Sequence, residues 1–160
     1  MQSDLIARCK ALGLTIATAE SLTAGLVSSA LAEVPGASAV LRGGVVTYAT
    51  DAKHSVLGLD SAILEHVVSE PVAQQMAQSV CWLLNADLGL ATTGVAGPES
   101  LDDQPAGTVW IAVHDARRNE GITRLLALEG SRADIRQNSA LAVIALALEY
   151  LAQIPGSGGE

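Results

Sequence analysis

The sequence predicts an α/β fold in three layers: a mixed, mostly parallel sheet, helices on both of its faces, and one hairpin near the C-terminus. Short apolar runs bounded by Gly, Pro or Asp alternate with segments whose apolar residues recur at helical spacing. Near the C-terminus, two apolar runs are joined only by the turn-forming residues 117–121, which is typical of a hairpin. The alternation favours parallel strands connected by helices, and the hairpin adds antiparallel strands.

Helix caps and chain breakers set the expected boundaries. Ser3 and Ser131 precede the first and last helical patterns as candidate caps, and Pro71 supports the helix whose first turn it occupies. Gly43-Gly44 interrupts an apolar run, which indicates a bulge or a close backbone approach. The expected elements are, in chain order, helix 3–12, strand 14–18, helix 22–34, strand 40–49, two short helices capped by Asp51 and Asp60, helix 70–84, strand 87–92, strands 108–114 and 122–128, and helix 133–153.

Length and composition narrow the class of protein. The 160 residues are expected to form one domain over 1–154, followed by a disordered, glycine-rich tail over 155–160. A net charge of −8 argues against general nucleic-acid binding. No apolar run reaches the roughly 18 residues of a membrane span. The first residues lack the basic and apolar regions of a secretion signal, so a cytoplasmic location without membrane attachment is expected.

Two further features concern the core and the assembly. Cys9 and Cys81 have no metal-site spacing and both fall in amphipathic helical stretches, so we expect them to be small core residues. The last helix is apolar nearly all round between residues 140 and 148. Such a segment is either buried on every side or part of a subunit contact, which favours a homodimer.

The side chains that could carry chemistry follow three of the expected strands. In sheets of this kind, ligands bind at the carboxyl ends of the strands. The loops there offer hydroxyls, a lysine and a glycine turn: Ser21 and Thr23, then Tyr48 and Lys53, then Thr92, Thr93 and Gly94. The three histidines lie in poor contexts for a general base, which leaves lysine. A lysine buried among apolar groups loses basicity and can accept a proton from a serine.

Each of these residues also has a purely structural interpretation. Taken alone, Ser21 is more often a helix cap than a nucleophile. Tyr48 is more often a half-buried strand residue, and Lys53 a solvated helix residue, than a member of a catalytic site. The spacing of Tyr48 and Lys53 differs from the Tyr-x-x-x-Lys pair of short-chain dehydrogenases, and no glycine-rich dinucleotide fingerprint is present. Taken singly, the residues predict an α/β domain with a candidate serine or lysine site.

Several stretches in collinear order narrow this choice. They are TAESLTAG at 18–25, RGGVVTY at 42–48, AK at 52–53, VSEPV at 68–72, TGVAGP at 93–98, PAGTVW at 105–110 and GSR at 130–132. Together they resemble the CinA C-terminal family, which includes the stand-alone nicotinamide-nucleotide amidases. The resemblance covers about residues 3–152, and the ordered set is far more specific than any single motif.

The resemblance implies an amidohydrolase. The implied reaction converts nicotinamide mononucleotide and water to nicotinate mononucleotide and ammonia, without a metal or cofactor. Ser21 is then the nucleophile, Lys53 the base and Tyr48 a supporting hydroxyl. Oxyanion donors are expected from the helix start after Ser21 and from the turn after Thr93. The residues implied to bind the nucleotide substrate are Thr23, Gly25, Gly43, Thr93, Gly94 and Arg132, the last through the phosphate.

Two departures from the family pattern and two rival functions remain open. The family often has Gly where this chain has Ala24, and Asp where it has Ser131. One rival is a non-catalytic nucleotide-binding or regulatory module of the same fold, because family membership does not prove activity. The other is an amidase for a different carboxamide.

Overall fold

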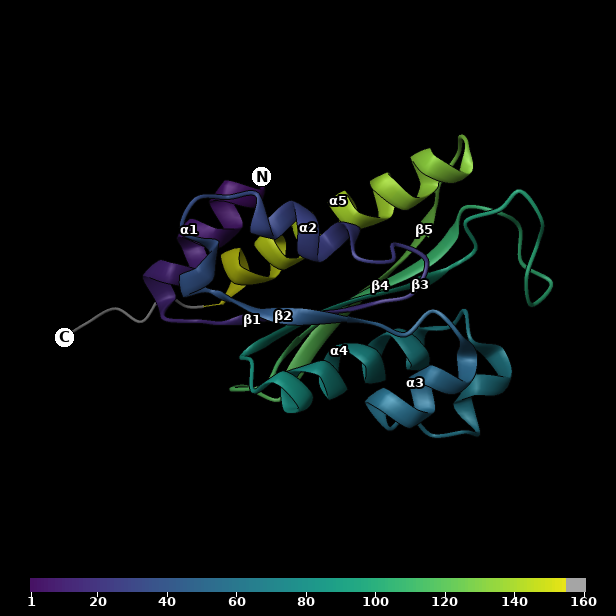
Figure 1. Cartoon of the computed structure of the whole chain (residues 1–160), viewed down its shortest axis with the longest axis horizontal. Helices are drawn as coiled ribbons and strands as arrows, with labels where there is room; N and C mark the ends of the chain where they lie inside the picture. Colours follow the sequence, from purple (N-terminus) through teal and green to yellow (C-terminus); the bar gives the residue numbers. More distant parts are fainter. Residues whose placement is uncertain (155–160) are drawn as a thin grey trace.

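The fold is a five-stranded mixed sheet with helices on both faces. It is seen in a computed structural model that describes residues 1–154, so the expected tail at 155–160 lies outside the described residues. Figure 1 shows α1, α2 and α5 on one face of the sheet and α3 and α4 on the other. The elements are α1 (Gln2–Leu12), β1 (Ile16–Glu20), α2 (Leu26–Ala32), β2 (Leu41–Val46), α3 (Thr50–Leu57), α4 (Glu70–Leu84), β3 (Leu88–Gly94), β4 (Thr108–Asp115), β5 (Glu120–Ala127) and α5 (Arg132–Gln153), with single 3₁₀ turns at Ala37–Ala39 and Ile63–His66.

The strands lie in the order β2-β1-β3-β4-β5, and the predicted mixed sheet with a C-terminal hairpin is confirmed. β1 pairs in parallel with both β2 and β3, whereas β4 and β5 form the antiparallel hairpin. The β1–β2 register skips Arg42, so the predicted irregularity in this strand is present just before Gly43-Gly44. The carboxyl ends of β1, β2 and β3 therefore lie at the same edge of the sheet.

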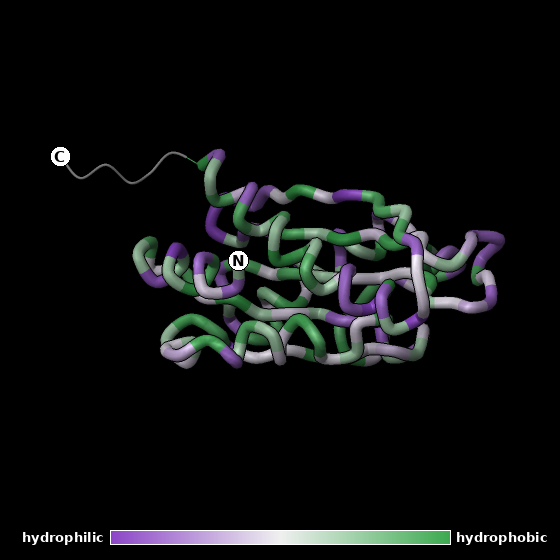
Figure 2. Tube along the Cα trace, turned by 90° about the horizontal axis from the view of Figure 1, so that it is seen from above, coloured by the Kyte–Doolittle hydropathy of each residue, from purple (hydrophilic) through white to green (hydrophobic). Residues whose placement is uncertain are grey.

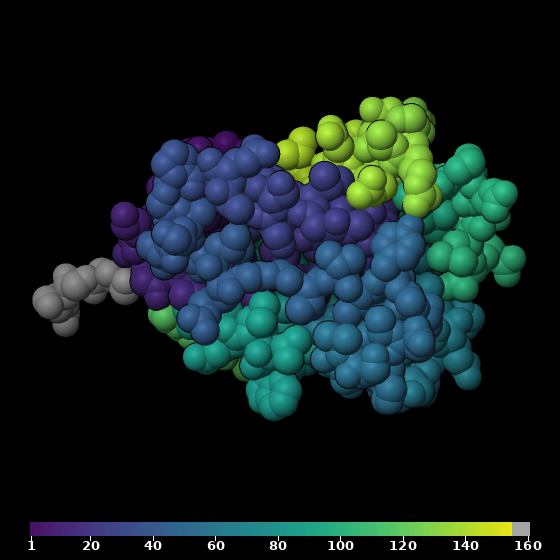
Figure 3. Space-filling view, viewed as in Figure 1, coloured from purple at the N-terminus to yellow at the C-terminus, as the bar shows by residue number. Residues whose placement is uncertain are grey.

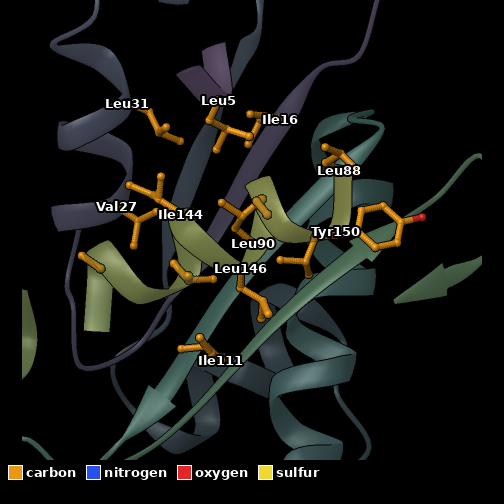
Figure 4. Close-up of a cluster of buried hydrophobic side chains, with 14 of the residues drawn as sticks. Leu5, Ile16, Val27, Leu31, Leu88, Leu90, Ile111, Ile144, Leu146 and Tyr150 are labelled. Carbon is orange, nitrogen blue, oxygen red and sulfur yellow. The ribbon is translucent and has the colours of Figure 1, made fainter. Parts of the chain in front are cut away.

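Two hydrophobic cores hold the layers together. Larger side chains fill the face under α1, α2 and α5, where Ile16, Leu90 and Ile111 from the sheet meet Val27 and Ile144 from the helices (Figure 4). The opposite face is lined by small residues such as Ala17, Ala19 and Ala91, which let α4 approach closely. In Figure 2, long hydrophobic (green) stretches run along the trace, whereas the loops at the right-hand end are largely hydrophilic (purple).

Several predicted boundaries are wrong by a few residues. The helix expected from 22 begins only at Leu26, because residues 21–25 form a turn with positive φ at Ala24 and Gly25. The first helix is capped at Met1 and α3 at Ala49, so Ser3 and Asp51 do not act as caps. By contrast, α4 has the predicted bounds, and Ser131 caps α5 in a capping box with Asp134.

The apolar segment 140–148 is packed on one side. Val143, Ile144 and Ala147 are fully buried, but Leu141 remains 40% exposed. The segment is therefore not buried on every side within this chain, and the homodimer stays a prediction. In the described part of the chain, no helix is long and apolar enough to cross a bilayer.

Candidate active site

The three predicted loops meet at one end of the sheet, where they enclose a cavity of about 380 Å³. β1 delivers Ser21, the segment after β2 delivers Tyr48 and leads into α3 with Lys53, and β3 ends at Gly94. The space-filling view shows the start of α5 (yellow-green), the α3 region (blue) and the β3–β4 loop (green) converging on the right-hand side (Figure 3). The lining includes Ser21, Tyr48, Lys53, Thr93, Gly94 and Arg132.

A buried lysine contacts the serine at the floor of this cavity. Lys53 Nζ lies 2.9 Å from Ser21 Oγ. It also donates to the carbonyl oxygens of Thr47 at 2.6 Å and Tyr48 at 3.4 Å. The Lys53 side chain is 1% exposed, and this burial lowers its pKa from 10.5 to about 8. Lys53 is therefore not the solvated helix residue of the structural interpretation, and its lowered pKa gives it a larger neutral fraction near neutral pH than an ordinary lysine has.

Glu20, which sequence reasoning missed, organises the turn that carries Ser21. Its carboxylate is 1% exposed and accepts hydrogen bonds from the backbone N–H groups of Gly25, Val27 and Ser28 at the start of α2. It also accepts from the hydroxyls of Thr18, Thr23 and Ser28. Glu20 is thus the N-terminal anion of α2, so Ser21 is not its cap. The only sequence signal was an acidic residue that ends an otherwise uncharged strand.

This arrangement corrects one expectation about the oxyanion. The backbone N–H groups at the start of α2 were expected to stabilise the negative charge of a tetrahedral intermediate. Three of these N–H groups instead donate hydrogen bonds to the Glu20 carboxylate. The second expected set of donors, in the turn after Thr93, stays a prediction, and Ala96 and Gly97 of that turn line the cavity.

Tyr48 and Arg132 form the mouth of the cavity. Arg132 Nη2 donates to the Tyr48 hydroxyl at 2.8 Å, and Nη1 donates to the Gly97 carbonyl at 2.6 Å. The Tyr48 side chain is 54% exposed. Its hydroxyl therefore faces Arg132, while its backbone carbonyl contacts Lys53. Arg132 is the first residue of α5, which places its guanidinium beside a helix N-terminus.

One wall of the cavity is largely apolar. It is formed by Val67, Val68 and Leu101, the last of which is 48% exposed. Thr93 ties this wall to the sheet, because its hydroxyl donates to the Val67 carbonyl at 2.9 Å. A Cβ at Gly94 would lie 2.8 Å from the Thr108 carbonyl oxygen, so only glycine fits there without a shift of the backbone.

Three residues implied to bind substrate lie elsewhere. The Thr23 hydroxyl is fully buried against Glu20 and Thr92. Gly25 is the N-cap of α2 and donates its N–H to Glu20. Gly43 sits within β2, where a Cβ would face Leu84. None of the three lines the cavity, so their predicted contact with substrate stays a prediction.

The geometry defines a three-layer α/β/α protein with a serine–lysine pair in a cavity at its strand ends. Within residues 1–154, no cluster of His, Cys, Asp or Glu side chains is arranged to hold a metal ion. The family model described as "CinA C-terminal domain" matches residues 1–151. The chain therefore belongs to the CinA C-terminal domain family.

Relatives and solved structures agree with this assignment. The chain is 45% identical over 145 residues to a CinA-like protein of Frankia casuarinae, covering 89% of this chain and 33% of that protein. It is 43% identical over 150 residues to a CinA-like protein of Mycobacterium tuberculosis, covering 91% and 34%. The chain thus spans about a third of the length of these curated relatives. A crystal structure of a CinA superfamily protein from Klebsiella pneumoniae superposes with a TM-score of 0.89 at 32% identity, covering 96% of this chain and 99% of that one.

Proposed function

We propose that this domain is an amidohydrolase that converts nicotinamide mononucleotide to nicotinate mononucleotide and ammonia through an acyl-enzyme on Ser21. The observation that carries the proposal is the 2.9 Å contact between Ser21 Oγ and the buried Nζ of Lys53, whose pKa is lowered to about 8. A serine becomes a nucleophile when an adjacent base can take its proton. A lysine with its ordinary pKa would be protonated and could not do so.

The contacts of Lys53 suit this role in both protonation states. As an ammonium it has three N–H groups for its three oxygen partners, namely Ser21 Oγ and the carbonyls of Thr47 and Tyr48. After losing one proton it keeps two N–H groups for the two carbonyls, which leaves its lone pair toward Ser21. The Ser21 hydroxyl then donates to Nζ, in the direction that proton transfer needs.

The reaction follows in two halves. Ser21 Oγ attacks the carboxamide carbon while its proton passes to Lys53 Nζ, and the carbonyl oxygen becomes an oxyanion. Collapse of the intermediate breaks the carbon–nitrogen bond, and Lys53 returns the proton to the departing ammonia. A water molecule then attacks the ester and gives its proton to Lys53. The ester carbon–oxygen bond breaks, Lys53 returns the proton to Ser21 Oγ, and the carboxylic acid is released.

The shape and charge of the cavity support a nucleotide carboxamide. Its volume of about 380 Å³ lies within the roughly 300–1,000 Å³ of ordinary ligand sites. A flat pyridine ring suits the apolar wall of Val67, Val68 and Leu101, next to the serine. The phosphate suits Arg132 at the mouth, where a guanidinium and a helix N-terminus coincide.

A substrate panel tests the proposal. Purified wild-type protein and Ser21→Ala are incubated with nicotinamide mononucleotide, nicotinamide riboside, nicotinamide and glutamine, and released ammonia is measured. We expect the wild type to act best on the mononucleotide, less on the riboside because it lacks the phosphate, and Ser21→Ala to release almost none. Binding of the mononucleotide without ammonia would instead identify a nucleotide-binding module. Preferred release from glutamine would identify an amidase for another carboxamide.

A further inference from the structure

A second arginine on α5 contacts the turn that carries the nucleophile. Arg136 Nε donates to the Leu22 carbonyl at 2.8 Å, and its Nη2 donates to the Thr23 carbonyl at 3.3 Å. These are the two residues that follow Ser21. Arg136 is half-buried, and none of the ion pairs among residues 1–154 includes it. Its contacts with the turn are therefore made to backbone carbonyls and not to a carboxylate.

The turn that Arg136 holds is a strained one. Ala24 has a φ of 47°, in the left-handed region that non-glycine residues rarely adopt. Glu20 fixes the N–H groups on the far side of this turn, at Gly25, Val27 and Ser28. Arg136 fixes carbonyl groups on its near side. The buried carboxylate of Glu20 thus binds N–H groups of this turn, and the guanidinium of Arg136 binds its carbonyl groups.

The two arginines of α5 have separate targets. Arg132 and Arg136 are four residues apart, so they share one face of the helix. Arg132 reaches the cavity mouth at Tyr48 and Gly97. Arg136 does not line the cavity and instead reaches the turn behind Ser21. Arg132 can therefore touch a ligand, while Arg136 can act only through the turn.

We propose that Arg136 is a positioning residue that holds the Ser21 turn, so that Ser21 Oγ stays within hydrogen-bond distance of Lys53. This inference rests on the proposed role of Ser21 as nucleophile. A displacement of about 1 Å in a reacting group can cost on the order of 10²-fold in rate. Loss of Arg136 should therefore lower kcat about 10- to 100-fold with little change in KM, because no contact with the substrate is lost.

The test compares Arg136→Met, which keeps the apolar stem, with Arg136→Lys, which keeps the charge but not the fork of donors. Arg124→Ala, which removes an exposed arginine on β5, is the control. Two rates are measured: ammonia release from nicotinamide mononucleotide, and labelling of Ser21 by a fluorophosphonate. In labelling, Ser21 Oγ forms a bond to phosphorus, fluoride leaves, and Lys53 takes the proton.

We expect Arg136→Met to label and turn over about 10- to 100-fold more slowly, Arg136→Lys to lie in between, and the control to match wild type. Wild-type labelling rates in both Arg136 variants would overturn the proposal, as would a raised KM with unchanged kcat. If Arg136→Met does not fold, Arg136→Lys decides between the same outcomes. A wild type that labels rapidly yet releases no ammonia from nicotinamide mononucleotide would refute the proposed activity on that substrate, while the labelling series still tests Arg136.

Discussion

At the residue scale, the most informative side chain is Lys53. It is among the largest fully buried side chains of the described residues, and its amine forms hydrogen bonds with Ser21 Oγ and two backbone carbonyl oxygens. Burying an amine disfavours its charged form. Lys53 therefore lowers the free energy of unfolding relative to an apolar residue at this position. A buried amine with a lowered pKa in a cavity is a candidate functional group, which supports the proposed role of Lys53 as a base.

The titration of Lys53 predicts a pH dependence of stability. Its pKa is about 8 in the folded protein, against its ordinary value of 10.5. Between these values the unfolded chain binds more protons than the folded one, so the free energy of unfolding should rise with pH. Below about pH 8 both states are protonated and this slope vanishes. Lys53→Met removes the group, so the wild type should gain stability relative to Lys53→Met as pH rises from 8 to 10 in urea unfolding experiments. A difference that is flat over this range would contradict the assigned pKa.

Ala24 gives a second prediction. A left-handed conformation costs a non-glycine residue about 1–2 kcal/mol, and Ala24 has a φ of 47°. Glycine relieves this strain but adds chain entropy to the unfolded state, worth about 0.4–1 kcal/mol. We expect Ala24→Gly to stabilise the protein by up to about 1 kcal/mol. Ala30→Gly within α2 is the matched control, with an expected loss of about 0.5–1 kcal/mol. Destabilisation by Ala24→Gly would show that the turn does not strain this residue.

At the scale of elements, the predictions succeeded where local signals decide. Pro71 and the periodic apolar residues fixed both ends of α4, and the Ser131 hydroxyl determined the start of α5. The start of α2 was misplaced because residues 22–25 are held as a turn by Glu20 and Arg136. Arg136 is more than a hundred residues away from this turn, with separations of 114 and 113. Contacts of that range leave no periodic pattern in the sequence.

The candidate site was likewise predicted in part, where local motifs indicate it. The positions of the strand ends and the family resemblance predicted a shared site, and five of the predicted residues do line one cavity: Ser21, Lys53, Tyr48, Thr93 and Arg132. The resemblance also implied Thr23, Gly25 and Gly43 as substrate-binding residues, but the structure places them outside the cavity lining. Glu20 was overlooked because an acidic residue at a strand end is ordinarily solvated.

The start of α2 gives a prediction about Glu20. Glu20→Gln replaces one carboxylate oxygen with an amide that cannot accept from the N–H and hydroxyl donors around it. Leaving buried donors unpaired costs about 1–3 kcal/mol. We therefore expect a loss of about 2–3 kcal/mol in the free energy of unfolding. Glu129→Gln, at an exposed position, should change it by less than about 0.5 kcal/mol. Equal stabilities of the two variants would show that Glu20 does not anchor α2.

At the scale of the whole molecule, the homodimer remains to be tested. Leu141 on α5 is 40% exposed and lines a groove of about 210 Å³ with Leu26 and Ala30 of α2. Pairing this face with its symmetry mate would bury the apolar side chains left open by one chain. Light scattering should give twice the mass of one chain. Leu141→Lys should reduce it to one chain, while Leu125→Lys, which alters an exposed leucine on β5, should not. A monomeric wild type, or a dimer that survives Leu141→Lys, would contradict this interface.

In the proposed mechanism, Ser21 and Lys53 act as one catalytic unit. The most direct measurement is the rate of ammonia release from nicotinamide mononucleotide by the wild type, Ser21→Ala, Lys53→Met and the double variant, across pH 6 to 10. Each single variant should lose on the order of 10²–10⁴-fold, and the double variant should be little worse, because both residues serve the same step. Wild-type kcat should rise with pH through about 8, where Lys53 loses its proton. Near-wild-type turnover by Ser21→Ala, or losses that multiply in the double variant, would contradict the account.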